Sequence, residues 1–211
     1  MKKTIITTAV CAMASMANAT LVLVTNGDFE AGASNWGNFA SGGTLVSFPA
    51  TGGNTGGFGK VDNTAGAWGG GLVSPGDFEF PGNTGIPLAS MGLVAGETYT
   101  FQMDMINLAG DGLGGVKFES WGAAMISNTG DVPASGQSSS WATYTWDYTI
   151  DAAATSIKIV PLLTGGSNNA GGSINSSIGF DNVGVNVVPE PSGFALAALG
   201  ALGLLGRRSR K

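Results

Sequence analysis

The amino-acid sequence predicts an all-β fold, an antiparallel β-sandwich, over residues 20–187. Several segments of about six to ten residues alternate apolar and polar side chains, which is the period of a strand that buries one face. Glycine is dense, since 32 of the 36 glycines lie in this stretch. Each glycine inside a helix costs about 1 kcal/mol relative to alanine, so long helices are disfavoured. About 170 residues suffice for one hydrophobic core but not for two.

The sequence of the first half of the domain predicts short strands. Residues 21–24 form an apolar run that is typical of a strand, and Asn26-Gly27-Asp28 follows as a turn. Residues 41–85 are dense in glycine, asparagine and threonine, and isolated aromatic residues punctuate them. We therefore expect short strands and long loops there.

The second half predicts longer strands, with faces that can be assigned by parity. In residues 98–106 one face carries Tyr99, Phe101, Met103 and Met105, and the other carries Thr100, Gln102 and Asp104. After Gly114-Gly115, residues 116–123 place Val116, Phe118 and Ser120 opposite Lys117, Glu119 and Trp121. Residues 141–150 gather Tyr144, Trp146, Tyr148 and Ile150 on one face, and we expect Trp141 and Trp146 in the core. Residues 156–163 and 178–187 complete the set, and one face of each sheet is expected to be solvated.

The charge and composition of this domain exclude several classes of function. Residues 20–188 hold three lysines, no arginine and thirteen acids, a formal charge of −10. Such a surface repels phosphate backbones, so nucleic-acid binding is disfavoured. The same stretch has no cysteine and no histidine, which excludes disulfides, thiol catalysis and histidine-based triads.

Both ends of the chain carry export signals. Lys2 and Lys3 precede an apolar stretch over residues 5–16, and Ala17-Asn18-Ala19 is the small-x-small pattern that signal peptidase needs. Residues 1–19 are therefore interpreted as a signal peptide. At the other end, residues 188–211 hold Pro189-Glu190-Pro191, an apolar run over 193–206 and a basic finish. As a helix the run measures about 21 Å, short of the roughly 30 Å hydrocarbon core, which favours a transient anchor.

This tail resembles the PEP-CTERM sorting signal of Gram-negative bacteria that make exopolysaccharide. The resemblance implies recognition by an exosortase and removal of the short hydrophobic helix near Pro189-Glu190-Pro191. It also implies passage through the inner membrane to the cell surface or the extracellular matrix.

Four motifs in the middle of the chain resemble the galactose-binding-like jelly roll, as in carbohydrate-binding modules of families four and nine. They are Asn26-Gly27-Asp28-Phe29-Glu30 with Trp36, and the stretches at 93–101, 141–144 and 178–183. The resemblance implies a jelly roll in which Glu30 and Asp181 meet beside a structural calcium ion. The alternative is that both acids are solvated turn or strand-end residues.

The polar side chains Gln102, Asp104, Glu119 and Trp121 are expected on one sheet face, where they form the predicted ligand-binding set. An aromatic ring stacks on the apolar face of a sugar, and amides and carboxylates bind its hydroxyl groups. The alternative is an ordinary solvated sheet face, and Trp36 and Trp68 in loops are the next candidates.

Two functions stay open at this point. One is a non-catalytic module that binds exopolysaccharide, and the other is a structural or adhesive biofilm protein without a defined sugar ligand. Hydrolysis by the acid pairs Asp77/Glu79 or Asp28/Glu30 is disfavoured, because no catalytic signature accompanies them.

Overall fold

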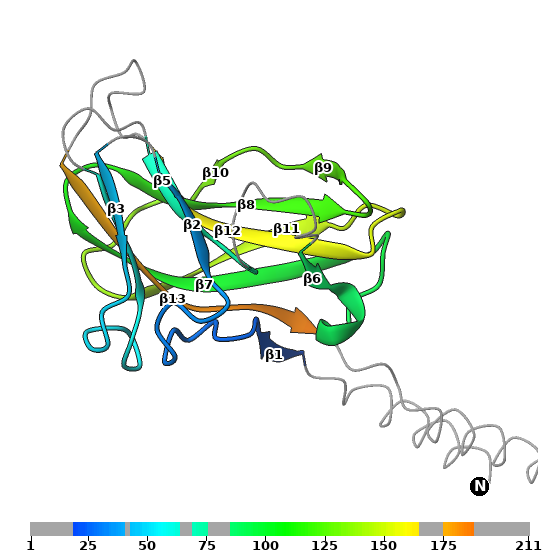
Figure 1. Cartoon of the computed structure of the whole chain (residues 1–211). Coiled ribbons are helices and arrows are strands. Elements are labelled where there is room, and N and C mark those ends of the chain that lie inside the picture. Colours follow the sequence, from blue (N-terminus) through cyan, green and yellow to red (C-terminus); the bar gives the residue numbers. More distant parts are fainter. Residues whose placement is uncertain (1–18, 41–42, 64–68, 76–84, 165–174, 188–211) are drawn as a thin grey trace, which may run out of the picture. The chain divides into compact units, whose positions relative to one another are not determined.

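The computed structural model describes residues 19–40, 43–63, 69–75, 85–164 and 175–187 (Figure 1). One compact unit spans Val22–Asn186, and the two ends of the chain, Met1–Leu21 and Val187–Lys211, are grouped apart from it. Apart from Ala19, the predicted signal peptide lies outside the described residues, as does the sorting segment 188–211. No helix within the described ranges is long and apolar enough to cross a membrane.

The domain is an all-β sandwich of two antiparallel sheets, which confirms the predicted fold class. The first sheet has the order β11-β7-β13-β4-β3, and β1 pairs with β13. Its strands are β1 (Thr20–Leu23), β3 (Thr44–Ser47), β4 (Gly59–Asn63), β7 (Thr98–Ala109), β11 (Ala142–Thr149) and β13 (Ser176–Val187).

The second sheet has the order β10-β8-β12-β5-β2, with β9 paired to β8 and β6 paired to β12. Its strands are β2 (Gly37–Ala40), β5 (Gly69–Val73), β6 (Ile86–Pro87), β8 (Leu113–Trp121), β9 (Met125–Asn128), β10 (Val132–Pro133) and β12 (Ser156–Thr164). A short 3-10 helix, η1 (Leu88–Met91), follows β6. Figure 1 shows the long strands β7 and β13 of the first sheet beneath β8 and β12 of the second.

The core lies between the sheets, and the parity assigned to the two clearest strands is correct. Phe101, Met103 and Met105 of β7 are each no more than 2% exposed, and Phe118 of β8 is 1% exposed. The rings of Phe101 and Phe118 lie 4.7 Å apart between centroids, and the ring of Phe118 stacks on that of Tyr148 at 5.0 Å. Aromatic side chains from both sheets therefore meet across the sandwich.

The outer face of the second sheet differs from the solvated face that the sequence predicts. Val160 and Leu162 of β12 are buried there together with Val73 of β5, and Phe39 of β2 packs against them. Gly71 pairs with Leu162 of β12 and with Phe39 of β2, and an atom of the Phe39 ring lies where a Cβ at Gly71 would clash with it. The ring covers neighbouring side chains because glycine leaves this space open. As a result, β12 is buried on both faces.

The tryptophans also differ from their predicted places. Trp141 and Trp146, expected in the core, are only half-buried. Trp36, expected in a loop as a ligand candidate, is 6% exposed and stacks on Phe29 with ring centroids 4.8 Å apart. Its indole N–H donates to the carbonyl oxygen of Asn26 over 2.8 Å, so it closes the first turn of the domain. Trp68 lies outside the described residues.

Candidate functional site

The structure divides the predicted ligand-binding set between the two sheets. Gln102 and Asp104 lie on β7 in the first sheet, and Glu119 and Trp121 lie on β8 in the second. The expectation that the four share one sheet face is therefore wrong. The cause is the turn between β7 and β8, which crosses from one sheet to the other and is fastened by the Gly112 N–H donating to Ser176 Oγ over 2.8 Å.

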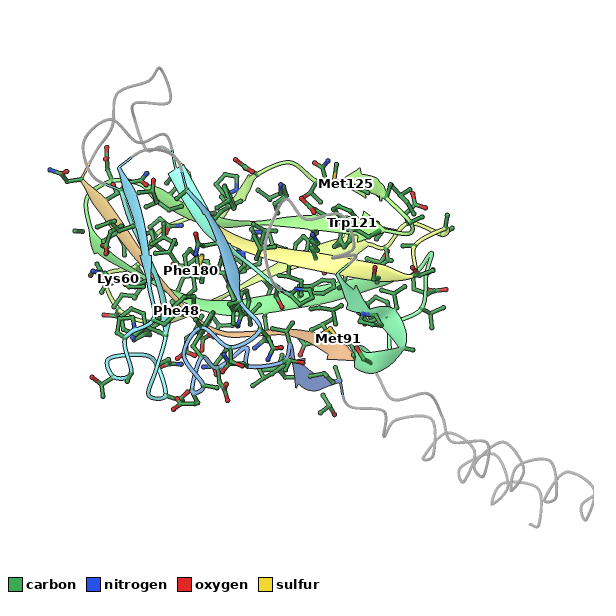
Figure 2. The ribbon with its side chains drawn as sticks, viewed as in Figure 1. Phe48, Lys60, Met91, Trp121, Met125 and Phe180 are labelled. Atoms are coloured by element: carbon green, nitrogen blue, oxygen red, sulfur yellow. The ribbon has the colours of Figure 1, made fainter. Side chains whose placement is uncertain are left out.

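Glu119 is the centre of a charged group on β8 and β12, which we call the Glu119 cluster: Lys117, Glu119, Trp121 and Lys158. Lys117 Nζ lies 2.8 Å from Glu119 Oε1, and the Trp121 indole N–H donates to Glu119 Oε2 over 2.8 Å. Lys158 faces Glu119 in the β12–β8 ladder. Its ammonium group lies 4.3 Å from the centroid of the Trp121 ring, a cation–π contact. Figure 2 shows Trp121 near the end of β8, beside Met125 of β9.

The Glu119 cluster is unusually buried for its charge. Glu119 is 2% exposed and Lys158 is 1% exposed, whereas Trp121 is half-buried. Burial lowers the pKa of Lys158, Glu119 opposes that shift, and Lys117 adds to it. Two of the domain's three lysines gather at this one carboxylate. Charged side chains are seldom fully buried unless they are paired, so the cluster is a specific feature of the fold.

The two predicted calcium ligands, Glu30 and Asp181, hold the same segment, residues 54–57. Glu30 Oε1 accepts the Gly57 N–H over 3.1 Å. Asp181 Oδ2 accepts the N–H groups of Asn54 and Thr55 over 2.8 and 3.2 Å. Gly56, at a φ of 121°, lies so close to the Glu30 carboxylate that a Cβ would clash with it. Acids about 150 residues apart in sequence thus converge on one glycine-containing loop.

Asp104 belongs to this group and not to a solvated face. It faces Asp181 in the β7–β13 ladder and is 5% exposed. Its Oδ1 accepts the Thr143 hydroxyl over 2.6 Å, and its Oδ2 accepts the side-chain amides of Asn54 and Asn182, both over 2.8 Å. We call Glu30, Asp104 and Asp181 the carboxylate cluster. Gln102, on the same strand, accepts the Asn186 side-chain amide over 3.0 Å.

A bulge in β13 places Asp181. The pairing of β13 with β7 shifts register between Asp181 and Gly184, and Asn182 takes a left-handed φ of 49°. The Asn182 N–H donates to Asp181 Oδ1 over 2.8 Å. Sequence reasoning did not find Asn54 or Asn182. The adjacency of Asn182 to Asp181 was the one usable signal, because nothing near Asn54 in the sequence points to Asp104.

The oxygen chemistry of the carboxylate cluster suits a hard cation, but the structure gives it other partners. Among the described residues, no three histidine, cysteine, aspartate or glutamate side chains gather closely enough to hold a metal ion. Burial raises the pKa of Asp181, Asp104 raises it further, and N–H donors from Asn182, Thr55 and Asn54 lower it. Backbone N–H groups therefore partly neutralise this carboxylate. A cation at Asp181 Oδ2 would need the loop to present carbonyl oxygens in their place.

Of the acid pairs considered for hydrolysis, the structure describes Asp28 and Glu30. The Glu30 N–H donates to Asp28 Oδ1 at 3.5 Å, which is a local turn contact. Asp77 and Glu79 lie outside the described residues.

Comparison with known proteins identifies the tail and the fold. A family model for the PEP-CTERM protein-sorting motif matches residues 187–211, and no curated protein matches the chain. The enzymatically active domain of bacteriophage CBA120 tailspike protein 4 is similar in structure, with 14% identity and a TM-score of 0.51. The match covers 81% of this chain and 22% of the tailspike chain, so this chain spans about a fifth of that length.

Two further structures are similar. An arabinose-bound MgGH51 α-L-arabinofuranosidase has 11% identity and a TM-score of 0.50, over 81% of this chain and 26% of that one. The C-terminal family 22 carbohydrate-binding module of Clostridium thermocellum Xyn10B has 17% identity and a TM-score of 0.46, over 82% and 96%. The likeness to families four and nine stays a prediction. The chain therefore carries a PEP-CTERM protein-sorting motif at residues 187–211, C-terminal to a domain with a jelly-roll β-sandwich fold.

Proposed function

We propose that this is an exported surface or matrix protein, processed by an exosortase, whose β-sandwich binds polysaccharide without catalysis at the Glu119 cluster. The observation that carries the proposal is the joining of a half-buried tryptophan, a carboxylate and two ammonium groups on one sheet face. An indole ring suits the apolar face of a pyranose, and the half-buried Lys117 suits its hydroxyls, whereas the buried Glu119 and Lys158 hold the ring and this ammonium group in place. Their mutual contacts fix the side chains before a ligand arrives, which lowers the entropy cost of binding.

The binding proposal is tested by Trp121→Ala. We expect affinity for a bound polysaccharide to fall by about 1 to 3 kcal/mol, roughly fivefold to 150-fold, because the stacking surface is lost. Affinity electrophoresis in a panel of polysaccharides measures this loss, and thermal unfolding checks the fold. Trp121→Phe is the matched control, since it keeps a ring beside Lys158 but loses the N–H bond to Glu119. A folded Trp121→Ala variant that binds as tightly as the wild type would place the ligand elsewhere.

The sorting motif supports a second part of the proposal, passage through the inner membrane with removal of the tail. In a host that has an exosortase, we expect the mature protein to begin at Thr20 and to lack Arg207 through Lys211. Mass spectrometry of both termini measures this. Replacing Pro189-Glu190-Pro191 by three alanines should leave the basic finish attached and the protein in the membrane fraction. Full-length tails on the wild-type protein at steady state would refute processing.

We also propose that the carboxylate cluster binds a structural calcium ion. Glu30 and Asp181 would hold the ion with carbonyl oxygens of the loop they contact, and the ion would tie the two ends of the domain together. In its absence, the N–H groups of residues 54, 55 and 57 serve as their partners.

One observation favours the alternative, a structural or adhesive matrix protein. Met125 and Ile126 of β9 are 46% and 42% exposed, and Met125 faces Trp121 in the β8–β9 pairing. Exposed apolar side chains of this kind suit association with another protein surface. A saturable polysaccharide ligand distinguishes the two functions, because the alternative requires none.

A further inference from the structure

A hollow lies at the edge of the sandwich, between β10 and β11. Its volume is about 380 Å³, within the size range of small-molecule sites. Its lining is Val132, Pro133, Ala134, Ser135, Thr143, Tyr144, Thr145 and Trp146, and none of these side chains is charged. The hollow thus offers an aromatic, neutral surface within an acidic domain.

The sheet topology explains why this hollow is open. β11 is the last strand of the first sheet, and β10, the last strand of the second sheet, has only two residues. Tyr144, Trp146 and Tyr148 share one face of β11 by parity. Tyr148 is covered by Phe118, whereas Tyr144 and Trp146 are half-buried. The short β10 offers too little surface to cover the two other rings, which is why the expected core position of Trp146 is wrong.

The two rings are arranged as a preformed surface. Their centroids lie 6.4 Å apart, with an angle of 32° between the ring planes. The Tyr144 hydroxyl donates to the Gly136 carbonyl oxygen over 2.8 Å and accepts the Ser138 N–H over 3.1 Å. Tyr144 is therefore fixed to the loop that follows β10, and its ring is in place before any ligand binds.

Trp146 is the exception among the tryptophans that the structure describes. Trp36, Trp121 and Trp141 each donate the indole N–H, to Asn26, Glu119 and Gly52 respectively. Trp146 has no such acceptor among the described residues. A buried tryptophan usually places this donor on a partner. Trp146 is half-buried, so its N–H, at a hollow with a second aromatic ring, is available to an acceptor on a ligand.

We propose that the β10–β11 hollow is a second sugar-binding site, which takes a neutral pyranose unit of a polysaccharide. The rings of Tyr144 and Trp146 would contact the apolar face of the sugar, and the Trp146 N–H would donate to one of its oxygens. Among the strands that the structure describes, β11 pairs with β7 alone, so its other edge offers further backbone donors and acceptors to hydroxyl groups. The uncharged lining and the acidic domain disfavour uronic acids. This site shares no residue with the Glu119 cluster.

The test uses the indole N–H signals of the full chain, labelled with ¹⁵N in tryptophan and assigned with Trp146→Phe. The probes are methyl glycosides of glucose, galactose, mannose and xylose, with glucuronate and galacturonate as charged controls. We expect the Trp146 signal to shift in a saturable way with at least one neutral glycoside and not with the uronates. The Trp121 signal reports separately on the Glu119 cluster, so failure at one site is distinguishable from failure at the other.

Two variants of Trp146 test the same proposal by the affinity of the responding glycoside. Trp146→Ala should weaken binding of the responding glycoside by about tenfold or more, and Trp146→Phe by less, because it keeps a ring. Leu45→Ala is the matched control, an exposed apolar residue at the opposite edge of the same sheet. Three outcomes would overturn the proposal: no neutral glycoside shifts the Trp146 signal, uronates shift it equally, or folded Trp146→Ala binds unchanged. A Trp146 signal that moves only with protein concentration would assign the hollow to a second copy of the chain.

Discussion

Replacing Asp181 by alanine is expected to lower the free energy of unfolding by about 3 to 5 kcal/mol. Asp181 is fully buried and accepts N–H bonds from Asn54, Thr55 and Asn182. Alanine would leave these donors without the acceptor, and each unsatisfied buried donor costs about 1 to 3 kcal/mol. Burial of the Asp181 carboxyl group raises its pKa, so its desolvation already costs the wild type some stability. Alanine removes that cost, which offsets part of the loss. Urea-induced unfolding measures the loss.

Glu30→Ala is the matched control for Asp181→Ala. Glu30 is exposed and accepts one N–H, from Gly57 of the same loop. Its removal should therefore cost much less, since water can reach the freed donor. If Glu30→Ala destabilises the domain as much as Asp181→Ala does, the hydrogen bonds to Asp181 are not the source of the stability.

The same pair of variants tests the calcium proposal. An ion that binds only the folded state at a hundredfold excess over its Kd adds about 2.7 kcal/mol and raises the melting temperature. We expect that rise in the wild type on going from chelator to millimolar calcium, and its loss in both variants. The absence of any rise in the wild type, with Asp181→Ala still strongly destabilised, would show that N–H donors alone hold the carboxylate cluster.

Alternation along a strand predicts its faces but not its sheet. The inward and outward faces predicted for residues 98–106 and 116–123 are correct, because side chains alternate between the two faces of a strand and Phe101 and Phe118 are buried on the inward face. The same pattern does not say whether the turn between them makes a hairpin or crosses the sandwich. The crossing turn is held by Ser176, more than fifty residues later, whose hydroxyl accepts the Gly112 N–H. For this reason the sequence pattern places Gln102 and Asp104 on one face with Glu119 and Trp121, although the two pairs lie in different sheets.

The sequence likewise does not predict which polar residues are buried. Asp104 and Glu119 both stand at outward positions by parity, yet each is covered. Asp104 is covered by the loop that carries Asn54, a contact between residues 50 apart. For Trp146 the prediction is wrong in the opposite sense, because the residue is less buried than expected. It has an inward position on β11, but β10 has only two residues and leaves the ring partly uncovered. Edge and loop coverage are tertiary properties, and local pattern carries no signal for them.

Replacing Glu119 by alanine is expected to cost about 3 to 5 kcal/mol of unfolding free energy. The change removes the carboxylate that faces the buried Lys158, the ion pair with Lys117 and the acceptor of the Trp121 N–H. Lys60 and Asp62 of β4 provide a matched control, because they form a pair at the same spacing but are 29% and 28% exposed. Asp62→Ala should change stability by about 1 kcal/mol or less.

The pH dependence of Glu119→Ala identifies the cause of its instability. Burial lowers the pKa of Lys158 below 10.5, and Glu119 opposes that shift, so the variant should lower the pKa further. A base with a lowered folded-state pKa binds its proton more tightly when unfolded, so the free energy of unfolding rises with pH between the folded value and 10.5. Glu119→Ala should therefore recover stability over that interval more steeply than the wild type. Glu119→Ala/Lys158→Met should lose this slope and recover part of the stability, since methionine keeps the apolar stem of the lysine and leaves no buried charge to desolvate. A double variant as unstable as Glu119→Ala, with the slope unchanged, would mean that Glu119 acts through packing and not through its charge.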